Sequence, residues 1–500
     1  MLNSVGLENY KCFKNNTSLD IAPLTVLCGV NSSGKSSLIK SILMLKQTAS
    51  GRTQDPSVIL SGDYVDCGTF ADVINDGDKT RKEFVITNSF QIHNHKLEII
   101  GKYIRKQDAK AFNELRRMYS NVKGEIKYFK FDLKLVVKEL DDTINEFAKY
   151  ISNNFIQSYR IDISAVDTKG EKIKTCKGYI FFENNEDEEK HKLSWNNIPG
   201  FSKAKKSFQN YKCTCTFNGL ALTNIFAYDM PNDVKSVVPN ILAISRIIMA
   251  QYDGIHYIAP LRNVPERTYI IKKNVTSVGI SGEDTPILLA KLKNMKTMTQ
   301  MFCPYTNKEE VDKNGYIKEE YHQIIQQWLD YFEIKKLDVQ GENGAININL
   351  GKHNISDIGF GMSQLLPIIT QGIVMDKEQT LMIEQPEIHL HPKMELQMAD
   401  FLIQMARSDR NVIIETHSDH IVNRLIRRVM EDYSLNDLIK IYYIENIDGE
   451  SIIHEPIEIN QYKGTREDYE NFFTQYTTET GEIIETGLTN MMRKANENNN

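Results

Sequence analysis

The sequence predicts a mixed α/β fold, with a mixed sheet at its core, an antiparallel β subdomain and an inserted mixed helical lobe. An apolar run from Leu24 breaks into a glycine- and serine-rich turn and resumes with helical spacing up to Leu45. This pattern indicates strand, loop and helix. Two later apolar runs end in polar side chains at Glu384 and Thr416, and continuous runs of this kind are typical of buried parallel strands.

Composition narrows the class of protein. The chain has 500 residues, 41% hydrophobic content and a net charge of −6, which predicts a globular protein of two or three domains with no overall attraction to nucleic acid or anionic membrane. No apolar run approaches the roughly 20 residues that span a bilayer, and the first residues lack the pattern of a signal peptide. Seven scattered cysteines fit a reducing compartment. We expect a cytoplasmic protein without membrane contact.

The loop after the first apolar strand carries a phosphate-binding pattern. Gly29, Gly34, Lys35 and Ser36 fill the fixed positions of G-x-x-x-x-G-K-[ST] between the predicted strand and helix. The glycines let backbone N–H groups face a polyphosphate, and the helix adds its positive dipole end. Lys35 is expected to reach the β- and γ-phosphates and Ser36 to bind Mg²⁺. The expected ATP-binding residues are Asn31, Ser32, Ser33, Gly34, Lys35, Ser36 and Ser37.

Short strands surround this loop in the first quarter of the chain. Residues 3–13 and 17–21 predict two strands that lead into it, and residues 58–75 and 83–92 have β-like composition with glycine punctuation. We expect these strands to form a small sheet over the nucleotide.

Residues 102–212 differ in residue pattern from the segment before them, and this change predicts an inserted lobe. Its apolar residues recur at spacings close to three and four, which favours a long amphipathic helix: Phe131, Leu135, Leu140, Ile144, Phe147 and Ile151. Further on, Lys203, Lys205 and Lys206 alternate with aromatic residues. These lysines could touch nucleic acid, although a solvated loop is the favoured alternative.

The centre of the chain alternates strand and helix. A strand from Ile255 is followed by Arg262 and Arg267, which could face phosphate, a partner subunit or a structural salt bridge. Residues 279–292 predict a loop and a helix capped around Glu283. Another helix is expected over residues 326–332.

The second half supplies partners for the phosphate loop. Two glycines and Ser363 precede an apolar helix whose N-terminus can bind an anion. Glu384 ends an apolar strand, where a carboxylate can hold Mg²⁺. His417 follows the next apolar strand, where an imidazole could hydrogen-bond the γ-phosphate or the attacking water.

In this order the motifs resemble those of ABC-type ATPases, which include chromosome-maintenance, RecF-like DNA-repair and OLD-like proteins. They most resemble AAA-family ATPases that carry a C-terminal domain of unknown function and occur in bacterial defence loci. The likeness rests on GVNSSGKSS at Gly29, APLRNVPER at Ala259, DIGFGMSQLLP at Asp357, EQPEIHLHP at Glu384, ETHSDHIVNRL at Glu415 and IYYIEN at Ile441.

The resemblance implies an ABC-type P-loop ATPase head that uses ATP and Mg²⁺ and dimerises around composite sites. Ser363 would contact, in trans, the γ-phosphate bound by the other subunit, although GFGMSQ departs from the usual signature. The segment from Glu387 would communicate across the dimer, and His417 would be the switch histidine. Gln47 is either the glutamine that senses Mg²⁺ or an ordinary surface residue.

The resemblance also suggests how the chain divides. Residues 1–101 would form the N-terminal half of the head and residues 102–212 the inserted lobe. Residues 213–439 would form the C-terminal half of the head, and residues 440–500 a small extension.

One position departs from the family pattern in a way that bears on catalysis. Where these ATPases carry a catalytic glutamate after the Mg²⁺ carboxylate, this chain has Gln385, which cannot accept a proton at neutral pH. Either Glu387 supplies the carboxylate, or hydrolysis is slow and the ATP-bound dimer is long-lived. We favour slow hydrolysis, because losing a general base costs about 10²- to 10⁴-fold in rate. Glu387, His389 and His391 alternate, which suggests subunit contacts or, as the alternative, a metal site.

Three functions fit these features. The favoured one is an ATP-gated dimeric sensor or scaffold that regulates a separately encoded effector, such as a nuclease, in anti-phage defence. The alternative is a RecF-like or SMC-like DNA-repair or chromosome ATPase, which would bind DNA through the lysine patch and through Arg424, Arg427 and Arg428. A nucleotide-binding subunit of a membrane transporter fits least, because the inserted lobe and the signature do not suit one.

Overall fold

The computed structural model describes most of the chain in twelve segments. The described residues are 1–51, 56–75, 81–93, 126–140, 154–184, 191–196, 211–226, 237–271, 274–304, 315–342, 344–462 and 464–465. The lysine patch of Lys203, Lys205 and Lys206 lies outside them. Among the described residues, no helix combines the length and the apolar character that crossing a membrane requires.

A six-stranded sheet lies at the centre of the molecule, and it confirms the predicted mixed sheet core. Its order is β11-β18-β19-β3-β20-β21, with every neighbouring pair parallel except the last. Three of its strands are buried at every residue, which explains their continuous apolar sequences. The strands are β3 (Leu24–Cys28), β11 (Ile255–Ile258), β18 (Thr380–Glu384), β19 (Asn411–Glu415), β20 (Ile439–Ile447) and β21 (Glu450–Ile453).

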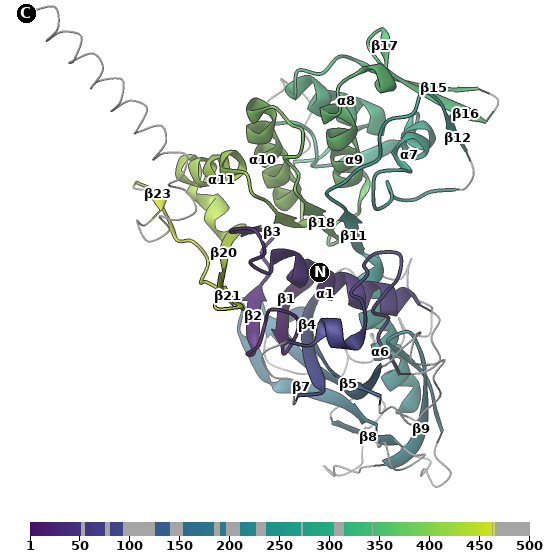
Figure 1. Ribbon diagram of the computed structural model, residues 1–500, viewed down its shortest axis with the longest axis vertical. Helices are drawn as coiled ribbons and strands as arrows, with labels where there is room; N and C mark the ends of the chain where they lie inside the picture. Colours follow the sequence, from purple (N-terminus) through teal and green to yellow (C-terminus); the bar gives the residue numbers. More distant parts are fainter. Residues whose placement is uncertain are drawn as a thin grey trace, which may run out of the picture.

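The two faces of this sheet belong to two different hydrophobic clusters. On β3, Leu27 lies in one cluster while Val26 and Cys28 lie in the other, as the two-residue period of a strand requires. The first cluster includes α1 (Lys35–Ser50) and α6 (Val238–Asp253), which pack together. The second is covered by helices from the C-terminal half, seen in green in Figure 1. These helices are α7 (Thr285–Leu292), α8 (Tyr321–Tyr331), α9 (Gly361–Val374), α10 (Pro392–Arg407) and α11 (Asp419–Glu431).

A nine-stranded antiparallel sheet forms the purple and blue part of Figure 1. Its order is β10-β9-β8-β7-β6-β5-β4-β1-β2. The strands predicted at residues 3–13, 17–21 and 83–92 are confirmed as three of its members. The strands are β1 (Leu2–Glu8), β2 (Thr17–Asp20), β4 (Glu83–His93), β5 (Ile126–Glu139), β6 (Asn154–Asp167), β7 (Lys172–Glu183), β8 (His191–Asn196), β9 (Tyr211–Asn218) and β10 (Ala221–Phe226).

Two local predictions in this region are wrong. Phe131 and Leu135 lie in strand β5 and not in a helix, because they belong to an alternating series with Phe129, Leu133 and Val137 that faces the core. The rest of that expected helix, from residue 141 on, lies outside the described residues. Residues 58–75 form a loop with a short helix, α2 (Phe70–Val73), and not strands. The proposed domain boundaries stay a prediction.

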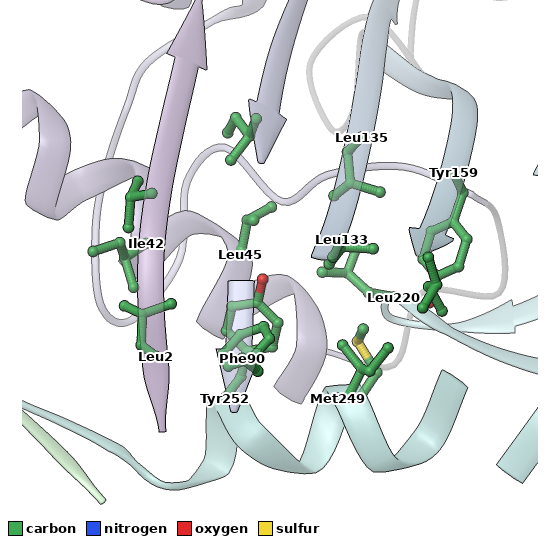
Figure 2. Packing of buried hydrophobic residues seen from close by; sticks show 14 of the residues in the cluster. Leu2, Ile42, Leu45, Phe90, Leu133, Leu135, Tyr159, Leu220, Met249 and Tyr252 are labelled. Atoms are coloured by element: carbon green, nitrogen blue, oxygen red, sulfur yellow. The ribbon is translucent and has the colours of Figure 1, made fainter. Parts of the chain in front are cut away.

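The antiparallel sheet packs against α6. In Figure 2, Phe90 lies beside Tyr252 of this helix, and Leu133 belongs to the same cluster as Met249, which the helix also carries. The rings of Phe90 and Tyr252 meet edge to face with centroids 5.1 Å apart, and Asn88 Nδ2 donates to the Tyr252 hydroxyl at 2.9 Å. Each such apolar side chain contributes about 1.5–3 kcal/mol through burial. Residues of the sheet, of α1 and of α6 belong to one hydrophobic cluster.

Smaller sheets complete the C-terminal half. The predicted helices at residues 279–292 and 326–332 are confirmed as α7 and α8, although no side chain caps the first of them. The remaining elements are β12 (Tyr269–Ile270), β13 (Lys296–Thr299), β14 (Ile317–Glu320), β15 (Leu337–Glu342), β16 (Ala345–Leu350), β17 (His353–Asn354), β22 (Ile459–Asn460), β23 (Gly464–Thr465) and the 3₁₀ turns η3 (Ile355–Asp357) and η4 (Tyr433–Asp437).

Candidate nucleotide site

The glycine-rich loop joins the end of β3 to the start of α1, as the sequence predicts. A cavity of about 460 Å³ opens over it. All seven expected ATP-binding residues, Asn31 to Ser37, line this cavity. Gln385, His417, Glu415, Lys11 and Cys12 complete its walls.

Two of the loop glycines cannot be replaced without moving their neighbours. Gly29 and Gly34 have φ values of 143° and 103°, in the region that side chains with a Cβ disfavour. An added Cβ would lie 2.1 Å from the Ile444 carbonyl oxygen at position 29 and 2.4 Å from Ser451 Oγ at position 34. The loop is therefore pressed against β20 and β21.

The Lys35 ammonium is held inside its own loop. Its Nζ donates to the carbonyl oxygens of Gly29 and Val30 at 3.0 and 2.7 Å and to Ser33 Oγ at 3.3 Å. Burial lowers the pKa of Lys35, and the nearby Glu415 opposes that shift. A buried cation among carbonyl groups is well placed to meet an anion that enters the cavity.

Two carboxylates end neighbouring strands beside this loop. Glu384 on β18 pairs in register with Glu415 on β19, which in turn lies beside β3. Glu384 Oε1 accepts a hydrogen bond from the Tyr257 hydroxyl at 2.6 Å. Ser36 Oγ lies 3.0 and 2.9 Å from the two Glu415 oxygens and donates to that carboxylate. The carboxylate nearest the phosphate loop is thus Glu415.

Burial raises the pKa values of both carboxyl groups. Burial and then the charge of Glu384 raise the pKa of Glu415 to about 7, although Ser36 and Lys35 oppose the shift. Burial also raises the pKa of Glu384. Both groups would be more readily ionised beside a cation.

The donor set fits a magnesium ion. Ser36 Oγ, Glu384 and Glu415 offer hard oxygen atoms at one sheet edge, and Mg²⁺ prefers one or two carboxylates together with phosphate oxygens.

Gln47 does not belong to this set, and that prediction is wrong. At about 1.5 Å per residue it lies roughly 16 Å from Ser36 along the same helix. Its amide is also occupied by the backbone of Ile59 and Val65.

Glu387 holds the segment that carries His417. Its carboxylate accepts hydrogen bonds from Thr416 Oγ1 and from the His417 backbone N–H, both at 2.8 Å, and burial raises its pKa. Burial and then Lys35 lower the pKa of His417, against a hydrogen bond with the Gly29 backbone. Its ring is therefore predominantly neutral at pH 7.

Gln385 faces the cavity from a strained backbone position. Its φ is 48°, a left-handed conformation that costs a residue with a side chain about 1–3 kcal/mol. Its N–H donates to the Glu415 carbonyl oxygen at 2.7 Å, which fixes the turn at the end of β18. At this turn the chain leaves the sheet beside the phosphate loop.

The signature helix α9 lies away from the cavity of the same subunit. Ser363 is only 7% exposed and its hydroxyl donates to the Phe360 carbonyl oxygen at 2.7 Å. The prediction that its side chain is available to a second subunit is therefore not supported. Gly359 and Phe360 are the exposed residues of this helix start. The Gly361 Cα lies against the His389 backbone, where a Cβ would be 2.8 Å from the carbonyl oxygen.

Arg262 connects this helix to the strand end that carries Glu384. It is 6% exposed, and its guanidinium donates to the carbonyl oxygens of Glu384 and Gln385 and to Gln364 Oε1. Burial lowers its pKa to about 10. Of the three roles considered for this arginine, the structure favours an internal one, although its hydrogen bonds go to carbonyl and amide oxygens and do not form the expected salt bridge. Arg267 forms an exposed salt bridge with Asp357.

Several expected surface features have internal partners. Arg424 and Arg428 bind the buried Asp400, and Arg427 binds Glu431, so the structure does not support a DNA surface made of these arginines. His391 caps α10 by accepting from the Lys393 N–H. Within the described segments, no three His, Cys, Asp or Glu side chains are arranged to hold a metal. This finding argues against the metal alternative for Glu387, His389 and His391.

Sequence reasoning missed Glu415, Arg262 as an internal link, and the cavity residues Lys11 and Cys12. Glu415 could have been noticed as a carboxylate that ends an apolar strand, the same signal that identified Glu384. Its contact with Ser36, however, depends on strand order, which the sequence does not reveal.

Comparisons with known proteins give one family match. A family model described as an AAA ATPase domain matches residues 1–422. No curated protein sequence matches the chain.

Solved structures of SMC heads are similar at low identity. The SMC head bound to the C-winged helix domain of ScpA is 11% identical, with a TM-score of 0.40, 91% of this chain covered and 96% of the other. The SMC head domain from Thermotoga maritima is 11% identical, with a TM-score of 0.33 and coverages of 92% and 99%. An SMC head with an extended coiled coil, bound to the C-terminal domain of ScpA derived from Pyrococcus furiosus, is 10% identical, with a TM-score of 0.37 and coverages of 91% and 95%.

Proposed function

The chain belongs to the AAA ATPase domain family, and from that premise we propose that it is an ATP-gated switch that hydrolyses ATP slowly. In this proposal ATP and Mg²⁺ bind between β3 and α1. Two copies associate around the bound nucleotide, and the ATP-bound assembly regulates a separately encoded effector in anti-phage defence.

The position of Glu387 and its hydrogen bonds support the proposal of slow turnover. Glu387 is not among the residues that line the cavity, and both of its carboxylate oxygens accept hydrogen bonds from the segment 416–417, which hold the carboxylate toward that segment. The residue that faces the cavity at the strand end is Gln385, which can orient water but cannot deprotonate it. ATP would therefore act as a long-lived clamp.

The remaining residues have roles that follow from their positions. The loop N–H groups and the Lys35 ammonium bind the phosphates, and Ser36 and Glu384 hold Mg²⁺. When bound, Mg²⁺ neutralises charge on the phosphate oxygens. A neutral His417 ring can donate to a γ-phosphate oxygen while Glu387 keeps its backbone in place.

Substitution of Gln385 tests this proposal. Gln385→Glu should raise the ATP turnover rate by about 10²- to 10⁴-fold, because it adds the missing general base. Glu387→Gln should not produce such a gain. The measurement is single-turnover ATP hydrolysis by the purified chain, with Lys35→Ala as the variant that fails to bind ATP. Brisk turnover by the wild type that survives Glu387→Gln would contradict the clamp.

The proposed effector rests on the resemblance of the six motifs to ATPases of defence loci. The corresponding experiment is to purify the chain with the products of its neighbouring genes and to measure the mass of the assembly with and without ATP. We expect an ATP-dependent complex that Lys35→Ala abolishes. Salt-dependent DNA binding by the isolated chain, without such a complex, would favour the repair or chromosome alternative.

A further inference from the structure

The carboxylate of Glu415 accepts a hydrogen bond from Ser36, the proposed Mg²⁺ ligand. The Ser36 hydroxyl lies 3.0 and 2.9 Å from its two oxygens. Glu415 is 5% exposed and sits in register with Glu384 on the next strand. In the described part of the chain, no Lys or Arg forms an ion pair with either carboxylate, and the Lys35 ammonium bonds to carbonyl groups.

We propose that Glu415 is a positioning residue of the Mg²⁺ site, which holds the Ser36 proton and supplies a second carboxylate beside Glu384. This inference rests on the proposed function and deepens it. A hydroxyl that donates its proton to Glu415 keeps its oxygen lone pairs available for a cation. The residue thus acts on the ion through Ser36.

A structural role alone does not explain this arrangement. Burying one carboxylate costs several kcal/mol when no cation compensates it, and a second carboxylate beside it adds repulsion. A glutamine could accept the Ser36 hydrogen bond without this cost. Two buried acidic groups next to a phosphate loop are therefore explained by a divalent cation between the chain and the phosphates.

Direct metal binding tests the inference. Binding of Mn²⁺ to the full chain in the presence of ATP is followed by electron paramagnetic resonance, which detects the free ion. Glu415→Gln should weaken Mn²⁺ binding by about 10- to 100-fold, the range for residues that orient metal ligands. Glu415→Asp keeps the charge but withdraws it from Ser36, and it should weaken Mn²⁺ binding as well. This second variant remains informative if Glu415→Gln does not fold.

A double variant separates positioning from a diffuse charge effect. If Glu415 acts through Ser36, the loss in Ser36→Ala/Glu415→Gln should be about that of the worse single variant and not the product of the two. Glu395→Gln removes a carboxylate that accepts from Ser418 Oγ and has no hydrogen bond to Ser36, and it is the matched control, expected to change Mn²⁺ affinity less than about threefold.

The outcomes distinguish this inference from the proposed function. Unchanged Mn²⁺ affinity in Glu415→Gln, an equal loss in Glu395→Gln or a multiplicative double variant would each overturn the role of Glu415. Reduced turnover with unchanged Mn²⁺ affinity would also overturn it and would point to a proton acceptor. ATP binding is measured separately in EDTA: a wild-type chain that binds no ATP contradicts the proposed function itself.

Discussion

At the scale of single residues, the phosphate loop combines tight backbone packing with a lysine that has several partners of its own. Gly29 is the tightest point, because its Cα lies against the Ile444 carbonyl group of β20. The backbone at this position therefore couples the loop to the neighbouring strand. A side chain at position 29 would displace the loop and β20.

Replacement of Gly29 tests this coupling. Gly29→Ala should lower the free energy of unfolding by about 3 kcal/mol or more, because it combines an unfavourable φ with a backbone clash, and it should impair ATP binding. Urea unfolding and nucleotide titration provide the measurements. Gly449→Ala is the control: its φ is also positive, at 89°, but nothing lies within 4 Å of the added Cβ, so it should cost about 1 kcal/mol. Equal losses in the two variants would show that φ alone matters.

At the scale of elements, Asp400 fastens three helices together. This residue of α10 is buried, and it pairs with Arg424 and Arg428 of α11 and accepts from the Tyr331 hydroxyl of α8. Burial alone would raise the pKa of Asp400, but the hydrogen bonds from Arg428, Arg424 and Tyr331 outweigh it and hold the pKa below 3.8. The cluster anchors the helices that follow the two carboxylate-ended strands.

The Asp400 cluster predicts both a mutational loss and a pH dependence. Asp400→Asn should lower the free energy of unfolding by about 3–5 kcal/mol at pH 7, since it removes the buried charge that Arg424 and Arg428 share and leaves Arg428 with the half-exposed Glu431. Because the folded-state pKa is depressed, this stabilisation is present above pH 3.8 and is lost as the pH falls through the lower folded value. The difference between wild type and variant should thus shrink below pH 3.8, which urea unfolding at several pH values can measure.

The control for this prediction is Asp432→Asn. Asp432 pairs with Arg407 but is 46% exposed, so its loss should cost no more than about 1 kcal/mol. A comparable loss in the two variants would mean that burial of the Asp400 cluster adds nothing.

The same scale shows what the sequence could and could not predict. Parallel strands were predictable because strands such as β18 are buried on both faces and read as unbroken apolar runs. Strand β5 was mistaken for a helix because Phe131 and Leu135 are four residues apart, a spacing that fits a helix face and a strand face equally. Only Leu133 between them distinguishes the two. Contacts set by strand order, such as that between Ser36 and Glu415, could not be predicted because no local pattern encodes which strands are neighbours.

At the scale of the whole molecule, the parallel sheet separates two hydrophobic clusters, and the nucleotide site lies at its edge. Strand β3 contributes Leu27 to one cluster and Val26 to the other. The two tryptophans of the chain are divided in the same way, since Trp195 packs against the first cluster and Trp328 lies within the second. Each cluster thus has its own fluorescent reporter.

Nucleotide binding should stabilise both clusters together. ATP with Mg²⁺ at about 100 times its Kd should add roughly 2.7 kcal/mol to the free energy of unfolding. Trp195→Phe and Trp328→Phe leave one reporter each, and the urea midpoint should rise in both variants. Adding Lys35→Ala to either variant should remove the rise. A shift seen by one tryptophan only would show that the clusters unfold independently.

The internal bonds of Lys35 have a consequence for which anions can enter. Its three acceptors belong to the loop itself, so an incoming anion gains only the difference between the new hydrogen bonds and those it replaces. A lone phosphate or sulfate offers few oxygens at the right spacing and gains little. A di- or triphosphate chain reaches the ammonium and the loop N–H groups at once. We therefore expect the loop to bind a di- or triphosphate more tightly than a lone phosphate or sulfate.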